Sequence, residues 1–396
     1  MILGIIIGLV VLTLLVLVHE WGHFIAARKS GVKVNEFGIG FPPRAIGWIK
    51  KDGKWVRFKK SDWDKPQKSL ILSINWLPIG GFCAMDGESD ADTKKGTFGA
   101  ATFWQKTKIL FAGVTMNWLV AFVIFTILAW TGMPEFINNQ FFLSGDDRTN
   151  PQPILIGEVL EDSPAYKAGL ESGDEIIAIS GEPVDSAKSI IAYNQAHPGE
   201  TVVYDIMRDG SVKTVDIKLN PADAEYLLGI TMSEKSQVLH YATWSAPLVG
   251  AATTVQLTGE TFRGFWDMLW NLGSGLARQL SFDDSTRQAG REDIGKVGDS
   301  VSGPVGIVGI IFPAFTSAGP TNIAFLAAII SISLACMKVL PIPALDGGRW
   351  FLIAIYRLRK KPLTTEVEAN IVSRAFIILI ALIVLITILD ITRFFR

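Results

Sequence analysis

The sequence has few charged residues, few histidines and almost no cysteine. Asp, Glu, Lys and Arg make up 19% of the 396 residues, and 37 basic residues nearly balance 38 acidic ones. Soluble domains typically contain about a quarter charged residues. A protein that binds nucleic acid through a basic surface is therefore not expected. Cys83 and Cys336 lie far apart in the sequence and cannot form a disulfide scaffold. The 49% content of apolar residues excludes a disordered chain.

The apolar residues are concentrated in four stretches that can each cross a bilayer, which takes about 20 residues. These stretches are 1–27, 109–133, about 322–340 and about 375–389. The first is interpreted as a transmembrane helix and not as a signal peptide, because it lacks a basic start and a small-residue cleavage site. Residues 236–259 are also uncharged, but they contain little Leu or Ile, so we expect interfacial or soluble helix there and no fifth span.

The segments between these stretches differ in charge. Residues 25–108 carry 16 Lys and Arg against 8 Asp and Glu, and residues 344–374 carry 6 against 3. Residues 131–320 carry 12 basic against 25 acidic residues. The positive-inside rule therefore predicts that the first two segments face the cytoplasm, and the acidic segment agrees with this orientation. Both termini are then expected on the outer side.

His19, Glu20 and His23 form an HExxH sequence at the end of the first apolar stretch. On a helix, residues i and i+4 lie on one face, so both imidazoles can bind one zinc ion while Glu20 acts as general base on a metal-bound water. Zinc lowers the pKa of that water toward neutrality. HExxH also occurs by chance, but two of only four histidines lie here, and ionisable residues in a transmembrane helix are costly and usually functional.

A catalytic zinc usually has three protein ligands, so the third should come from another membrane segment at the same depth. Asp346 is the strongest candidate, because it follows the third apolar stretch within residues 340–348. Two prolines break the helix in this segment, and irregular backbone at membrane depth is tolerated where it lines a cavity. An ordinary turn Asp before two glycines is the simpler interpretation of this segment by itself.

Several motifs together resemble the site-2 proteases, which are intramembrane zinc metalloproteases, and specifically the bacterial regulator of sigma-E protease type with a single PDZ domain. The segments that carry the resemblance are HEWGH at 19–23, FGIGF at 37–41, LPIGGF at 77–82, Ala112-Gly113 followed by Asn117, SGPVGI at 302–307 and LPIPALDGG at 340–348. The resemblance implies that His19, His23 and Asp346 bind one zinc ion and that Glu20 activates water. We assign substrate contacts to Gly38, Gly40, Gly80, Gly81, Asn117, Gly347 and Gly348.

The chain departs from this family at two positions. Lys338 stands eight residues before Asp346, where the family usually has Asn. If its side chain faces the zinc, its charge opposes the metal and competes for Asp346; if the helix turns it away, it can snorkel toward the interface. A substrate or active-site contact at position 338 is therefore in doubt. Val114 replaces a Pro that often follows Ala-Gly in the second helix.

Residues 153–234 are predicted to form a compact α+β domain, with short strand patterns and an Asp209-Gly210 hairpin turn. Ser163-Pro164-Ala165, Ala168-Gly169-Leu170 and Gly173-Asp174 resemble a PDZ domain in circularly permuted order, with Leu228, Gly229 and Ile230 as its ligand loop. PDZ domains bind peptides by adding a strand to a sheet edge. We favour a size gate that excludes substrates with large ectodomains over tight peptide binding; a spacer without a ligand is the alternative.

We therefore predict a polytopic α-helical membrane protein with four transmembrane helices, a membrane-associated β-hairpin region and an inserted α+β PDZ-like domain. Hairpins at 38–58 and 70–85 are expected to dip toward the active site, where a strand edge could pair with substrate; an ordinary cytoplasmic loop is the alternative. The expected segments are 1–27 first span, 28–103 hairpin region, 104–133 second span, 134–152 linker, 153–234 PDZ-like domain, 235–300 interfacial helices, 301–348 third transmembrane region and 349–396 loop and fourth span.

The expected function is zinc-dependent hydrolysis of peptide bonds within transmembrane segments, in a multi-pass protein of the bacterial inner membrane. Expected partners are the lipid bilayer and single-pass membrane proteins trimmed by a first cut, such as anti-sigma factors or remnant signal peptides, and not nucleic acid. The HEWGH end is expected toward the cytoplasm and the PDZ-like domain outside. A zinc-bound scaffold that recruits partners without catalysis is the alternative; a transporter is disfavoured because the helical pattern does not repeat.

Overall fold

The structure is a computed structural model that describes residues 2–51, 53–57, 69–150, 153–184, 186–232, 239–279, 283, 285–291, 303, 306–317 and 319–394. Phe58 of the expected hairpin region and Ser302, Pro304 and Val305 of the SGPVGI segment lie outside these residues. The chain forms two compact units. The first comprises Met1–Phe125 and Thr254–Arg396, and the second comprises Thr126–Thr253.

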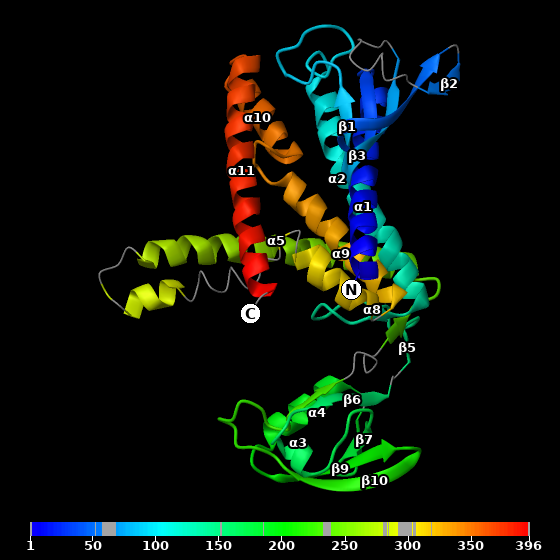
Figure 1. The fold of residues 1–396 in the computed structure, drawn as a ribbon, viewed down its shortest axis with the longest axis vertical. Helices are drawn as coiled ribbons and strands as arrows, with labels where there is room; N and C mark the ends of the chain where they lie inside the picture. The colour runs from blue at the N-terminus through cyan, green and yellow to red at the C-terminus, as the bar shows by residue number, and fades with distance from the viewer. Residues whose placement is uncertain are drawn as a thin grey trace. The chain divides into compact units, whose positions relative to one another are not determined.

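Four of the described helices are long and apolar enough to cross a membrane (Figure 1). They are α1 (Ile2–Lys29), α2 (Phe103–Thr131), α9 (Pro320–Val339) and α11 (Thr365–Phe394), the last over Thr365–Val384. They coincide with the four apolar stretches of the sequence. A helix suits the bilayer because every interior backbone N–H and C=O group is satisfied within the segment itself.

Small residues allow α1 to lie close to its neighbours in the first unit. A Cβ atom added at Gly8 would come within 2.8 Å of the Phe312 ring, and one at Gly22 within 2.5 Å of the carbonyl oxygen of Ala112. Phe312 begins α8 (Phe312–Ser317), which continues from the π-helix Ile307–Ile311. Close backbone approach at small residues is a common way for membrane helices to pack. Gly22, inside the HEWGH sequence, thereby holds α1 against α2.

The segment between α1 and α2 folds as a three-stranded antiparallel sheet in the order β2-β1-β3. Its strands are β1 (Val34–Lys51), β2 (Lys54–Arg57) and β3 (Ile71–Met85). The long strands pair twice: residues 34–39 pair with both 81–85 and 71–74, and 71–74 also pair with 46–49. Among the described residues, 81–85 therefore have a strand partner on one side only. A Cβ atom at Gly81 would come within 2.7 Å of Leu17, so this strand runs beside α1.

The chain turns sharply between α9 and α10 (Asp346–Leu358). Proline lacks a backbone N–H and clashes with the preceding turn, so Pro341 and Pro343 prevent α9 from continuing. Gly348 then packs directly against the carbonyl of Ile342, closer than any side chain would allow. The turn folds Asp346, the first residue of α10, back toward the end of α9.

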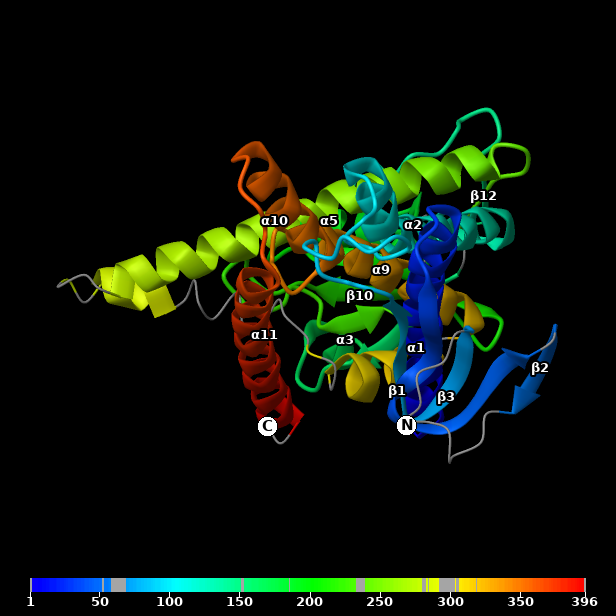
Figure 2. The ribbon, with the colours of Figure 1, turned by 90° about the horizontal axis from the view of Figure 1, so that it is seen from above.

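A single long helix, α5 (Ala246–Gln279), fills much of the region expected to hold interfacial helices. It is not among the candidate spans. Its part in the first unit, from Thr254 onward, lies across the direction of α1 and α11 in both views (Figures 1 and 2). Trp266, Leu269 and Trp270 are exposed along it. Aromatic side chains concentrate at membrane interfaces, so this part of α5 suits a position along the membrane surface.

The second unit contains a sheet in the order β10-β9-β7-β6-β11, with β8 beside β7. Its elements are β6 (Ile154–Val159), α3 (Pro164–Lys167), β7 (Glu175–Ile179), β8 (Glu182–Pro183), α4 (Ala187–Ala196), β9 (Thr201–Arg208), β10 (Ser211–Lys218) and β11 (Ile230–Met232). Ser163 and Ser186 cap the two helices by accepting backbone hydrogen bonds. Asp209 and Gly210 join β9 to β10 with φ values of 54° and 76°, as a tight hairpin turn requires.

Residues 134–152, expected from the sequence to be a linker, contain sheet structure instead. β12 (Leu239–Tyr241) pairs with both β4 (Met133–Pro134) and β5 (Arg148–Asn150). The buried Asp146 carboxylate accepts hydrogen bonds from Thr243 N at 2.8 Å and from Ser245 N at 3.0 Å. The hydroxyl groups of Thr243 and Ser245 donate to the same carboxylate, and together with the backbone bonds they hold the pKa of Asp146 below its usual value. β12 also stands inside the region 235–300 that was expected to hold helices, because it pairs with strands from a segment distant in sequence.

Candidate metal centre

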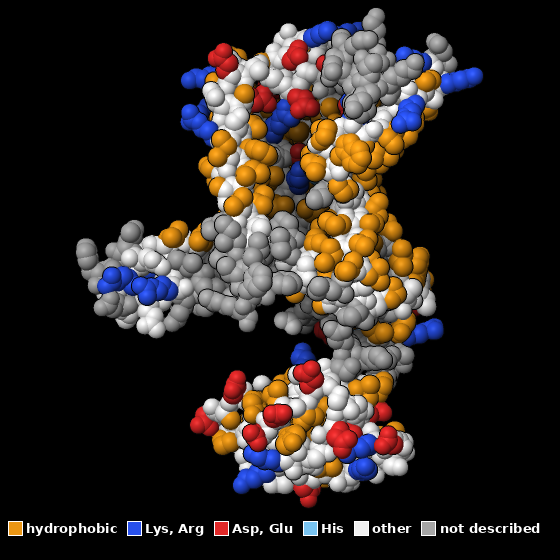
Figure 3. Space-filling view, in the orientation of Figure 1, with side chains coloured by type: hydrophobic (Ala, Val, Ile, Leu, Met, Phe, Trp, Pro, Cys, Tyr) orange, Lys and Arg blue, Asp and Glu red, His pale blue; other side chains and the backbone are white. Residues whose placement is uncertain are grey.

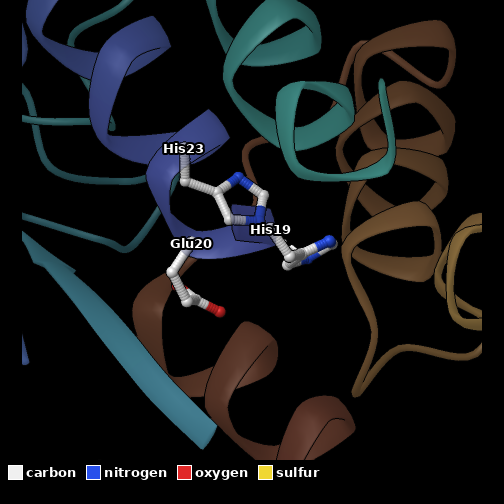
Figure 4. Close-up of side chains that lie close together, drawn as sticks. All are labelled: His19, Glu20 and His23. Atoms are coloured by element: carbon white, nitrogen blue, oxygen red, sulfur yellow. Dashed lines mark hydrogen bonds between the residues drawn. The ribbon is translucent and has the colours of Figure 1, made fainter. Parts of the chain in front are cut away.

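Two side chains of α1 and one from the start of α10 meet in the first unit. His19 Nε2 lies 3.1 Å from His23 Nε2 and 3.0 Å from Asp346 Oδ2. His23 Nε2 lies 3.5 Å from the same carboxylate oxygen. The two imidazoles lie next to each other on one face of α1 (Figure 4), as the i, i+4 spacing predicts. They are 3% and 6% exposed, so this is a buried cluster of polar atoms.

The three atoms fit the ligand set of a zinc ion. Ligands at about 2.0–2.1 Å from a tetrahedral zinc lie about 3.3–3.4 Å apart, close to the three separations found here. Two imidazole nitrogens and one carboxylate oxygen are the donor set of a catalytic zinc, which keeps a further position open for water or substrate. Without a cation, converging lone pairs in a buried site would be costly. The described residues can therefore hold a metal ion between α1 and α10.

Backbone and glycine contacts from α2 orient the imidazoles. His23 Nδ1–H donates to the carbonyl oxygen of Ile109 at 2.8 Å, which leaves its Nε2 as the atom with a free lone pair. A Cβ atom at Gly113 would come within 2.7 Å of Nε2 of both His19 and His23. Gly113 is therefore required next to the cluster, although the sequence marked it only as part of the family motif. His19 Nδ1 is buried and has no hydrogen-bond partner among the described residues.

Glu20 lies beside the cluster without belonging to the triangle of ligand atoms. The candidate ligand atoms of His19, Glu20 and His23 lie within 4.8 Å of one another, and the Glu20 side chain extends alongside the two rings (Figure 4). Its partial exposure distinguishes it from the two buried imidazoles. A carboxylate in this position can reach a water molecule held near the cluster.

Lys338 faces the cluster. Its Nζ atom lies 3.8 Å from Asp346 Oδ2, and its side chain is 30% exposed. The turn after α9 brings the two residues together. Of the two orientations that the sequence allowed for Lys338, the structure therefore has the one that faces Asp346. The space-filling view shows a hollow between α11 and α1, with a basic side chain visible inside it (Figure 3).

The residues expected to contact substrate lie in three places. Gly80 and Gly81 are on β3 beside Val16 and Leu17 of α1, and Gly38 and Gly40 are on the paired part of β1. Gly347 and Gly348 pack against backbone carbonyls at the turn before α10. Asn117 on α2 is buried, and its Oδ1 has no hydrogen-bond partner among the described residues.

The expected ligand loop of the PDZ-like domain lies in the second unit. The carbonyl oxygen of Leu228 accepts a hydrogen bond from Ala165 N, and that of Gly229 accepts one from Leu160 N. Gly229 has a φ of 78° and packs against Ser163, so a larger residue is excluded there. Ile230 begins β11, the strand at the end of the sheet.

Two histidines on an apolar helix and a carboxylate at the start of α10, with a glutamate beside them, are the residue types of a metallopeptidase site. The chain belongs to peptidase family M50, whose model it matches over residues 7–382. It is therefore a metalloprotease of the site-2 protease class, and the family implies zinc. Its four apolar helices fit a multi-pass protein of the inner membrane.

Individual relatives match along nearly the whole chain. A Shouchella clausii protein named zinc metalloprotease RasP is 25% identical, with 97% of this chain and 98% of that one covered. A Clostridium perfringens protein, named provisionally as a zinc metalloprotease, is 29% identical over 98% of both chains. The solved PDZ domain of an SdrC-like protein from Listeria monocytogenes is 27% identical over 22% of this chain and 92% of its own length, with a TM-score of 0.20.

Proposed function

We propose that this protein cleaves transmembrane segments of single-pass membrane proteins, after a first cut has removed most of their ectodomain. Anti-sigma factors and remnant signal peptides are the substrate classes we favour. The observation that carries the proposal is the convergence of His19, His23 and Asp346 on a buried point at the end of an apolar helix, with Glu20 alongside. Buried ionisable groups in such a helix are costly and therefore mark function.

In this proposal His19, His23 and Asp346 hold one zinc ion. Zinc, when bound, polarises the scissile carbonyl and lowers the pKa of a coordinated water. The Glu20 carboxylate accepts a proton from the attacking water and delivers it to the nitrogen of the leaving amine. Ile109 and Gly113 keep the imidazoles in the orientation that this ligand set requires.

The substrate must be unwound before it can be cut, because the backbone groups of a helix are already hydrogen-bonded. The strand 81–85 of β3 has a free edge among the described residues and runs beside α1. An extended substrate segment could add to such an edge by backbone hydrogen bonds. We therefore assign substrate contacts to the glycines of β1 and β3, to Asn117, and to Gly347 and Gly348.

The orientation in the membrane follows from loop charge. The basic segment 25–108 supports an orientation with the HEWGH end of α1 toward the cytoplasm and the acidic PDZ-like domain outside. We favour a PDZ-like domain that acts as a size gate and excludes substrates with large ectodomains, over one that binds peptides tightly. β11 is only three residues long, which offers little edge for tight peptide binding at Leu228, Gly229 and Ile230.

The proposal is tested with the full chain purified in detergent, by measuring bound zinc and cleavage of a model transmembrane peptide. The parent should contain one zinc ion and cleave the peptide. Glu20→Gln should keep the zinc and lose at least about a hundredfold in rate, because a general base contributes about 10²–10⁴. Equal cleavage by both proteins would contradict the mechanism.

A zinc-bound scaffold that recruits partners without catalysis is the second candidate function. The contact between Lys338 and Asp346 favours it, because a cation at a ligand carboxylate opposes the metal. The same experiment separates the two functions: zinc bound by a parent protein that does not cleave the peptide would support the scaffold.

A further inference from the structure

One carboxylate oxygen at the centre of the site is shared by three groups. Asp346 Oδ2 lies 3.0 Å from His19 Nε2, 3.5 Å from His23 Nε2 and 3.8 Å from Lys338 Nζ. Lys338 approaches from the last turn of α9, on the other side of the proline turn. A metal held by the two imidazoles would use this same oxygen. The metal and the ammonium group would therefore compete for Asp346 Oδ2.

We propose that Lys338 competes with zinc for Asp346 and thereby weakens zinc binding, so that occupancy of the site follows the free zinc concentration. This rests on the ligand set of the proposed function. In the zinc-free chain, the ammonium group compensates the charge of the partly buried carboxylate. When zinc takes Oδ2, the two cations repel each other across a few ångströms of poorly screened space. The Lys338 side chain is partly exposed, so it can move away from Asp346 as the metal binds.

The opposite arrangement, with Lys338 pointing to the membrane surface, would leave zinc affinity unaffected. The observed contact predicts the direction in which zinc affinity should change. Removing the cation should strengthen zinc binding, whereas mere damage to packing at the end of α9 would weaken it. The sign of the change therefore distinguishes competition from a structural role.

The test is a competitive zinc titration against a chelating dye, using the full chain in detergent. Lys338→Asn and Lys338→Met should bind zinc at least about tenfold more tightly than the parent, which corresponds to about 1.4 kcal/mol. Lys338→Arg keeps the charge and should stay near the parent. Lys361→Asn is the matched control, because it removes an exposed cation beyond α10 and should leave the affinity unchanged.

Unchanged or weaker zinc binding by Lys338→Asn and Lys338→Met, in variants that elute as folded monodisperse protein, would overturn the proposal. If one of them fails to fold, the other and Lys338→Arg still decide the sign. Cleavage assays distinguish this failure from failure of the proposed function. A parent that cleaves through Glu20, with zinc affinity independent of Lys338, keeps the function and rejects the competition.

Discussion

Two carboxylates, the buried Asp174 in the second unit and the partly buried Asp346 in the first, are compensated in different ways. Asp174 is 1% exposed, and its two oxygens accept separate hydrogen bonds from Arg208 Nε and Nη2, each at 2.6 Å, while Glu171 N donates at 2.9 Å. Burial favours the neutral acid, but these bonds outweigh it and hold the pKa of Asp174 below its usual value. Asp346 instead presents one oxygen to three groups that crowd around it.

The difference teaches how to separate a structural charge from a functional one. Around Asp174, donors are distributed over both oxygens, so the pair is complete without a ligand. Around Asp346, the approaching atoms converge, and His19 Nδ1 remains buried without a partner among the described residues. Convergence of this kind suits a metal site, because all the donor atoms of a ligand set must reach one ion.

Removing Asp346 should have the largest effect. We expect Asp346→Ala to reduce zinc affinity at least about a hundredfold, because even partners outside the ligand set contribute about 10–100-fold. Peptide cleavage should fall below detection. Asp174→Asn serves as the control for the comparison and should keep the parent's zinc content. Full zinc occupancy in Asp346→Ala would show that the third ligand is another residue.

A smaller loss is expected at Gly113. In a helix, alanine is more favourable than glycine by about 1 kcal/mol, so Gly113→Ala should not destabilise α2 by itself. The new Cβ would, however, meet both imidazole Nε2 atoms and displace them. Zinc affinity should fall at least about tenfold in a dye-competition titration.

Gly259→Ala on α5 is the matched substitution, because a Cβ there meets no atom within 4 Å. It should bind zinc like the parent. If Gly113→Ala binds zinc as tightly as Gly259→Ala, then α2 does not constrain the imidazoles.

The smallest effect on zinc binding should come from the satisfied pair in the second unit, whose loss should instead change stability. Asp174→Asn leaves the Arg208 cation partly buried without its partner, which we expect to reduce local stability by about 2–3 kcal/mol. Hydrogen exchange of amides in β6 to β10, measured by mass spectrometry on the full chain, should accelerate accordingly. Asp216→Asn, on the exposed side of β10, should change little. Equal protection in both variants would contradict the importance of the pair.

This stabilisation should depend on pH with a defined sign. The pKa of folded Asp174 is lowered, so its contribution is complete above the unfolded value of about 3.9 and is lost as the pH falls through the folded value. The difference in unfolding free energy between parent and Asp174→Asn should therefore be constant near neutral pH and shrink below about pH 4.

The spacing of HEWGH was sufficient to predict that His19 and His23 share a helix face, because helix geometry is local. The four apolar stretches likewise predicted the four long apolar helices. Asp346 was the strongest candidate for the third ligand because it follows the third apolar stretch, but by itself its segment also fitted an ordinary turn, and the resemblance to a family was needed to choose between the two. Its contact with the imidazoles depends on the tertiary fold.

Three other features of the site could not be predicted from the sequence. The acceptor for His23 Nδ1 is a backbone carbonyl, and Ile109 carries no side-chain signal for that role. Gly113 was visible as a small residue in the uncharged stretch 109–133, which indicates close packing but does not identify the neighbouring group. The direction of Lys338 depends on the turn at Pro341 and Pro343, whose course follows from packing and not from the sequence pattern.

The double pairing of β1 and β3 could not be predicted from the sequence for a related reason. Alternating apolar residues predict strands, but they do not say that residues 71–74 lie between two parts of the same partner strand. Residues 134–152 were predicted to be a linker for the same reason. Their strands pair with β12, which is distant in sequence and gives no local signal.

The 327 positions that separate His19 from Asp346 set the order of events during biosynthesis. The ribosome delivers α1 to the membrane first, and its imidazoles must wait for the carboxylate until α9 and α10 have emerged. A nascent chain therefore cannot assemble the three-residue cluster before nearly all of it has been translated and inserted.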